Sequence, residues 1–191
     1  LGGMSVPAVN RYGYGYVQGA DAAAKELGIT DEVQVEYVCG GQFYGDADIT
    51  AYMDTWYGSK GVEVVFACGG GIYTSAAEAA VKTGGKVIGV DSDQYTVLLP
   101  TDPTTAANIC TSMYKMANVT VSTLLSMALE GTLEWGHYEK WGLQEGVVGI
   151  ATDNDNYQTI FSDEMKAQIE QVQADATAGK LEIKSAIGMD N

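Results

Sequence analysis

The sequence of 191 residues has little positive charge, and this shortage excludes two classes of partner. Ten Lys and Arg residues stand against 25 Asp and Glu residues, which gives a net charge of −15. Nucleic acids and anionic membrane surfaces are bound by clustered basic side chains. We therefore expect no nucleic-acid partner and no attachment to a membrane surface through charge. Solubility is the simplest explanation of the acidic surface.

Cysteine and histidine are also scarce. Cys39, Cys68 and Cys110 form an odd and widely spaced set, with neither a disulfide framework nor the CxxC spacing of a metal site, and we expect them to be small buried residues. His137 is the single histidine, so no second histidine can complete a site with it. A Gly-x-Ser-x-Gly turn is missing too. The sequence therefore offers no catalytic constellation, and we do not expect an enzyme.

Long apolar runs are missing as well. No stretch of about 18 uncharged apolar residues is present, so no transmembrane helix is predicted. The opening Leu1-Gly2-Gly3 has neither an initiator methionine nor the pattern of a signal peptide. We interpret the chain as a fragment or a processed protein.

What the sequence does contain is a regular alternation of strand and helix patterns. Short apolar or alternating runs predict strands, and apolar residues at helical spacing predict helices. Strands are expected at residues 33–38, 62–67, 87–90 and 147–150, and helices at residues 8–27, 48–57, 74–82 and 162–178. Such alternation is typical of an α/β fold with a parallel sheet. The pattern loosens after Gln94, where we expect a short strand at 108–112, a helix at 113–129 and an aromatic loop at 133–146.

A glycine run and an acidic turn follow two of the predicted strands. Gly69-Gly70-Gly71 ends the strand at 62–67, and Asp91 ends the strand at 87–90. The carboxyl ends of parallel strands share one edge of a sheet, where ligands of open α/β folds bind. The spacing matches neither GxGxxG nor a phosphate loop, so nucleotide phosphates are rejected. A tight turn without a ligand and close approach of a small neutral ligand both remain open.

Individual residues at this edge have alternative explanations. Asp91 could accept hydrogen bonds from the vicinal hydroxyls of a sugar, whereas metal binding or helix capping would also explain Asp91 and Asp93. Phe43 and Tyr44 follow the strand at 33–38 and could stack on a sugar or a base, although core packing is the commoner role of a phenylalanine. For Lys115, a solvated surface lysine is the default interpretation.

Several motifs resemble one family in their order along nearly the whole chain. The opening Gly2-Gly-Met4, with the proline and glycines that follow it, is similar to the start of the second half of the basic membrane proteins. These are the purine nucleoside receptor A-like lipoproteins, which are substrate-binding proteins of ABC importers. Ile88-Gly-Val-Asp-Ser-Asp-Gln94 resembles the family's most specific signature, and Thr111-Ser-Met-Tyr-Lys115 resembles a second one.

The resemblance implies a lobe of a periplasmic-binding-protein type I fold, with a parallel sheet flanked by helices and the first lobe missing. Residues 1–98 would form the second lobe, and residues 146–191 would return to it. Residues 99–145 would cross to the first lobe, and we expect this segment to pair with a second copy in a homodimer. No cofactor is implied.

The same resemblance implies a nucleoside, most typically a purine nucleoside, bound between two lobes. Asp91 would hold the ribose hydroxyls, Phe43 or Tyr44 would stack on the base with Phe43 favoured, and Lys115 would contact the ligand or the hinge. Gly69 and Gly70 would form the wall. The partner would be an ABC permease, and the place the outer face of the membrane or the periplasm, with a lipid anchor outside this chain. The alternatives are the sensor domain of a cytoplasmic regulator and a binding protein for another neutral solute such as a sugar.

Overall fold

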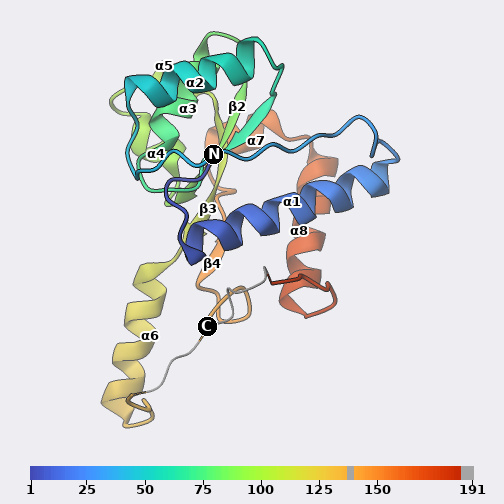
Figure 1. The fold of residues 1–191 in the computed structure, drawn as a ribbon. Helices are drawn as coiled ribbons and strands as arrows, with labels where there is room; N and C mark the ends of the chain where they lie inside the picture. Colours follow the sequence, from blue (N-terminus) through green and yellow to red (C-terminus); the bar gives the residue numbers. More distant parts are fainter. Residues whose placement is uncertain (137–139, 186–191) are drawn as a thin grey trace.

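The computed structural model describes residues 1–136 and 140–185, and a four-stranded sheet lies at the centre of this part (Figure 1). The strands follow in the order β1 (Val64–Phe66), β2 (Lys86–Asp91), β3 (Ile109–Lys115) and β4 (Val148–Ile150). The first three pair in parallel, and β4 pairs antiparallel with β3. The α/β fold with a mainly parallel sheet is thus confirmed.

Two helices, α2 (Ala47–Gly58) and α3 (Tyr73–Val81), pack together on one face of the sheet. Asp46 caps α2, because its carboxylate accepts a hydrogen bond from the backbone N–H of Ile49 at 2.9 Å. Alanines at positions 76, 77, 79 and 80 are fully buried, so α3 can lie close to its neighbours. Met53 of α2 is also fully buried in this apolar cluster. This face therefore carries the main core.

The long helix α1 (Pro7–Leu27) covers the opposite face. Val65 belongs to the core beside α2 and α3, whereas its neighbour Phe66 packs with Val9 of α1. Successive side chains of a strand point to opposite faces, which explains this division. The helix ends as predicted at Gly28, whose φ of 71° is the left-handed conformation of a glycine stop.

The remaining helices lie around the edges of the sheet. They are α4 (Gln94–Leu98), α5 (Pro103–Ala106), α6 (Ala117–Glu130), α7 (Asp155–Ile160) and α8 (Asp163–Thr177). Figure 1 shows α6 extending away from the rest of the molecule, and none of the residues of α6 or α8 is buried. No helix of the described residues is long and apolar enough to cross a membrane.

Three local predictions were wrong. Residues 33–38 lie outside the named strands, and Val33, Val35 and Tyr37 are exposed. A strand requires a hydrogen-bonded neighbour, and among the described residues the pairing in this region is an isolated bridge from Gly2 to Cys39. Residues 113–115 continue β3 instead of starting a helix, because pairing with both β2 and β4 overrides their helical spacing. The strand at 147–150 exists but is antiparallel.

The cysteines also divide. Cys68 and Cys110 are buried as expected, whereas Cys39 is exposed next to the unpaired segment 33–38. Burial raises the pKa of both inner thiols to about 11, so they stay protonated at neutral pH.

Part of the predicted crossover belongs to the sheet. β3 lies within 99–145 and pairs along its length with β2, so the chain departs from the sheet only after Lys115, where α6 begins. The division into residues 1–98, 99–145 and 146–191 stays a prediction. His137 of the aromatic loop lies outside the described residues.

Candidate functional site

The carboxyl ends of three parallel strands meet at one edge of the sheet, as the sequence predicts. The glycine turn at 69–71 follows β1, Asp91 is the last residue of β2, and Lys115 is the last residue of β3. Asp91 pairs in register with Tyr114, which brings Lys115 beside it. Residues that are separated by up to 46 positions in the sequence are thus assembled on one edge by strand pairing.

Asp91 and Lys115 form an ion pair at the surface of this edge. The Oδ1 atom of Asp91 lies 2.7 Å from the Nζ atom of Lys115, and the two side chains are 42% and 46% exposed. The ammonium group also lies 5.3 Å from the centre of the Tyr12 ring, so it is placed for a cation–π contact. Partial burial opposes the charge of Lys115, but the hydrogen bond and the negative charge of Asp91 outweigh it and raise the pKa of Lys115.

The backbone of Asp91 is unusual. Its φ of 73° makes it the only non-glycine residue with a positive φ among the described residues. Aspartate tolerates this region better than most side chains do, but the conformation still costs free energy. The strand therefore ends in a sharp turn that presents the carboxylate at the edge.

The glycine turn and Phe43 form a second group. The backbone N–H of Gly71 donates to the carbonyl oxygen of Phe43 at 2.8 Å. A Cβ atom on Gly70 would lie 2.9 Å from that same oxygen, and one on Gly69 would lie 2.6 Å from the Cα atom of Gly3. The chain's own backbone thus requires glycine at both positions. The explanation as a tight turn is sufficient for them, and the close approach of a ligand is not needed.

The two aromatic candidates differ in position. The ring of Phe43 lies against Gly3 and Gly69 and is 42% exposed. Tyr44 is 63% exposed and is bridged through its backbone to Gly71. Both rings are therefore partly exposed beside the glycine turn. The ring of Phe43 is the one that packs against the backbone of that turn.

A buried glutamine connects the two groups. Gln94 is 4% exposed; its Nε2 atom donates to the carbonyl oxygen of Gly70 at 3.4 Å, and its backbone N–H donates to the hydroxyl of Ser112 at 3.1 Å. The Oε1 atom of Gln94 has no hydrogen-bond partner among the described residues. This side chain links the glycine turn to the ends of β2 and β3, and so fixes Phe43 relative to Asp91.

Sequence reasoning did not assign a role in the site to Gln94 or Tyr12. Gln94 is the last residue of the Asp-Ser-Asp-Gln signature, so the motif itself could have pointed to a role for it. Tyr12 looked like one of several aromatic packing residues at helical spacing. Its place above Lys115 depends on how α1 crosses the sheet, which no local pattern reveals.

Asp93 has a separate and structural role. Its two carboxylate oxygens accept hydrogen bonds from the hydroxyl of Thr96 at 2.5 Å and from the side-chain amide of Asn154 at 3.2 Å. It thereby joins the start of α4 to the loop before α7. In the described residues no group of three or more acidic, histidine or cysteine side chains is placed to hold a metal ion.

Residues 1–182 match the model of one protein family, Bmp, which is described as "ABC transporter substrate-binding protein PnrA-like". The chain belongs to the Bmp family. The motifs that carried the resemblance, including Asp91 and Lys115, lie inside this match.

Curated members of the Bmp family include several borrelial proteins. The chain is 30% identical over 159 residues to "Basic membrane protein B" of Borreliella afzelii, which covers 81% of this chain and 42% of that protein. It is 33% identical over 153 residues to "Basic membrane protein A" of Borreliella afzelii, covering 78% of this chain and 43% of that protein. The match therefore covers less than half the length of each of these relatives.

Solved structures share the fold of this Bmp chain. A structure titled as ABC transporter system solute-binding proteins from Aeropyrum pernix K1 superposes with a TM-score of 0.73 at 19% identity, over 99% of this chain and 57% of that one. A "Transcriptional Activator of comK gene" from Bacillus halodurans superposes with a TM-score of 0.66 at 23% identity, over 86% and 53%. At these identities the likeness shows the fold alone.

Proposed function

We propose that this Bmp chain is one lobe of the substrate-binding component of an ABC importer, and that the lobe binds a nucleoside, most typically a purine nucleoside. The observation that carries the proposal is the pair Asp91–Lys115 at the carboxyl edge of the sheet, within a chain of the Bmp family. The protein is a carrier in this proposal, not an enzyme. A second lobe would close over the edge.

The chemistry of the edge suits a nucleoside. Asp91 offers carboxylate oxygens that accept from vicinal hydroxyls, and Lys115 offers a donor 2.7 Å away for the same sugar. Phe43 presents a partly exposed flat ring that can stack on a base. Gln94 holds the glycine turn, and with it Phe43, at a fixed place relative to Asp91. One ligand with a polar sugar and a flat base would use both groups.

Calorimetry of the full-length protein against a panel of nucleosides tests this proposal. We expect heat with at least one nucleoside, and a loss of about ten- to a hundred-fold in affinity in Asp91→Asn, because a hydrogen bond to a charged group contributes about 1.5–3 kcal/mol. Asp31→Asn makes the same change of charge at an exposed site and should bind normally. Heat with a free sugar or another neutral solute but with no nucleoside would refute the ligand class.

A ligand-sensing domain of a cytoplasmic regulator is the second candidate. It is favoured by the structural likeness to a protein titled as a transcriptional activator, although that likeness shows only the fold. A helix-turn-helix segment in the full-length protein would support the regulator. A lipidated cysteine would support the importer, with the protein at the outer face of the membrane or in the periplasm and an ABC permease as its partner.

We also infer that the isolated chain pairs through α6. Val121, Leu124, Leu125 and Leu129 are exposed on this helix, and Leu129 is 89% exposed. These spacings place them on one side of the helix, where they form an apolar stripe. Exposure of such a stripe to water is unfavourable, so it is a candidate contact surface. In a longer protein the remaining half of the chain has the size to cover this stripe; in the isolated chain a second copy would do so.

Light scattering over a range of concentrations tests the pairing. We expect a dimer, and a shift to monomer in Leu125→Glu, because the charge would be buried at the contact. Ser126→Glu, on the adjacent helix position, is the matched control and should leave the dimer intact. A monomer at all concentrations in the unchanged chain would show that the inference is wrong.

A further inference from the structure

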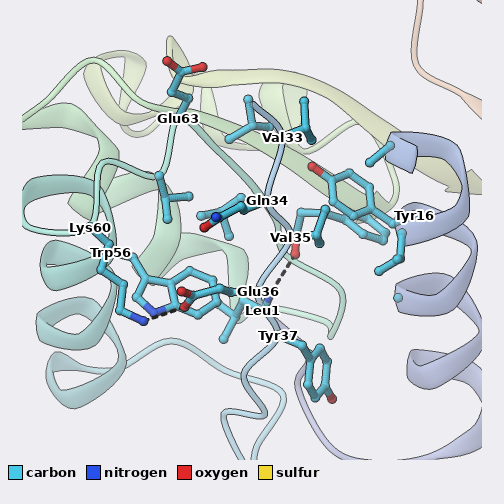
Figure 2. Close-up of a pocket in the computed structure, with 18 of the residues that line it drawn as sticks. Leu1, Tyr16, Val33, Gln34, Val35, Glu36, Tyr37, Trp56, Lys60 and Glu63 are labelled. Carbon is cyan, nitrogen blue, oxygen red and sulfur yellow. Dashed lines mark hydrogen bonds and ion pairs between the residues drawn. The ribbon is translucent and has the colours of Figure 1, made fainter. Parts of the chain in front are cut away.

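A slot of about 500 Å³ opens between the segment at residues 33–37 and strand β1. Figure 2 shows the two sides that flank it: Tyr16 enters from α1, and Trp56 enters from α2 on the opposite side. Neither Asp91 nor Lys115 lines this slot, so it is separate from the candidate ligand site.

One end of the slot is filled by the first residues of the chain, which bond both walls. Gly2 bridges in parallel to Cys39 on one side and to Cys68 on the other. The backbone N–H of Gly2 donates to the carbonyl of Val38, and the Leu1 amino group donates to the carbonyl of Phe66, at 2.8 and 2.9 Å. The walls are therefore two strand spacings apart, about 9–10 Å, which is the width that one strand fills.

Backbone groups of both walls point into the rest of the slot. On either side of β1, the carbonyl of Glu63 and the backbone N–H of Ala67 form hydrogen bonds with β2. By alternation, Val64 and Phe66 direct their backbone groups to the slot. On the other wall Val38 and Gly40 bond Gly2. By the same alternation, the backbone groups of Glu36 and Gln34 face the slot.

We propose that the slot is a docking site for an extended apolar strand that runs parallel to β1 and is joined to the amino group of Leu1. The pairing of residues 1–3 fixes the register: the residue directly before Leu1 would donate to the carbonyl of Glu36 and accept from the N–H of Val38. The residue before that would donate to the carbonyl oxygen of Val64 and accept from the N–H of Phe66. The occupant completes a continuous sheet from segment 33–38 to β4. The relative from Borreliella afzelii is matched over only 42% of its length, which leaves ample chain to supply such a strand.

The walls also define the side chains of the occupant. The residue directly before Leu1 would lie between Tyr37 and Phe66 on the face covered by Tyr16 of α1. The next residue would lie on the face of Leu1, in the core that contains Trp56 and Val65. The Glu36–Lys60 ion pair also lines the slot on the side of Trp56, but the neighbours of these two positions in the core are apolar. We therefore expect apolar residues at both positions, as in sheets that are covered on both sides.

The amino group of Leu1 supports a peptide bond at this place. It is buried, and burial lowers the pKa of the amino group to about 6. An amide N–H would make the same hydrogen bond to Phe66 without the cost of burying a charge. The docked strand also explains why residues 33–38 have a strand pattern: their partner lies in the slot.

Amide hydrogen exchange tests the proposal on the chain with four added β-branched residues before Leu1. We expect the N–H groups of Glu36, Val38 and Phe66 to exchange at least about tenfold more slowly than in the unextended chain, because they gain the hydrogen-bond partners that the register assigns. An extension of Gly and Ser, and the apolar extension with proline directly before Leu1, are the matched controls. Proline removes the N–H that would reach Glu36 and is not tolerated within a sheet.

Equal exchange at these three amides in all four chains would overturn the proposal. Protection that is present in the unextended chain and grows with concentration would also overturn it, because a second copy would then fill the slot. Contacts by NMR between the extension and Tyr37, in the register stated, would identify the bound strand even if the extended chain gains no thermal stability.

Discussion

The two sides of the central sheet differ in how many side chains they bury. On the side of α2 and α3, side chains such as Met53 and Ile72 are fully buried within one cluster. On the other side, α1 buries only Val9 and Ala24. At the edges of the sheet, none of the residues of α6 or α8 is buried. The comparison shows which part of the chain stabilises itself. The other part carries surfaces that only a further segment, lobe or copy would cover.

The largest expected effect contrasts the two sides directly. Met53→Ala removes a fully buried side chain and should lower the free energy of unfolding by about 2–5 kcal/mol. Leu129→Ala changes a residue that is 89% exposed in the single chain, and at concentrations where the chain is monomeric it should alter this free energy by less than about 0.5 kcal/mol. Urea titration under those conditions measures both. Similar losses in the two variants would mean that α6 is covered even in the monomer, and would remove the contrast.

A smaller effect concerns the border between the two sides, where Leu1 lies. The pKa of its amino group falls from 8.0 in the unfolded chain to about 6 in the folded one, because burial disfavours the charge. The unfolded state then binds more protons between these values, so the free energy of unfolding rises as the pH passes from below 6 to above 8, by roughly 2–3 kcal/mol in total. Urea titrations at several pH values measure it.

N-acetylation of the chain that starts at Leu1 is the control for this pH dependence. The acetylated chain has no amino group to titrate, so the difference between the two forms isolates Leu1 from every other group. The same slope in both forms would show that the amino group is not buried, and that the slot is open to water at this end.

The smallest effect tests the glycine turn at the crevice edge. Gly70→Ala places a Cβ at a φ of 54° and 2.9 Å from the carbonyl oxygen of Phe43, so we expect a loss of about 1–3 kcal/mol in the free energy of unfolding. Gly58→Ala, at the end of α2, meets no atom within 4 Å and should stabilise the helix by up to about 1 kcal/mol. Thermal unfolding compares the two. An equal change in unfolding temperature in the two variants would show that the glycine turn can rearrange to accept the added Cβ atom.

The same contrast explains what the sequence could predict. Helices α1, α2, α3 and α8 and strand β2 follow from local spacing and from glycine stops, which act within a few residues. Residues 33–38 have an equally clear strand pattern, but a strand forms only where a neighbour accepts its hydrogen bonds, and that neighbour is not a local property. The antiparallel direction of β4 likewise depends on where the chain returns after α6.

The candidate site divides in the same way. Asp91 and the glycine turn were predictable, because the carboxyl ends of parallel strands share an edge. The 2.7 Å contact of Asp91 with Lys115 could be expected only through the order of β2 and β3, which are neighbours by pairing. The roles of Tyr12 and Gln94 depend on a helix crossing and on a buried side-chain conformation, and neither leaves a periodic trace in the sequence.

The left-handed backbone of Asp91 has an evolutionary consequence. Glycine would adopt this φ of 73° at lower cost, so the fold on its own would favour replacing the carboxylate. Selection for heat resistance in the absence of a ligand would therefore be expected to replace this aspartate by glycine early. The persistence of an acidic residue there, generation after generation, would itself be a record of selection for a task other than folding.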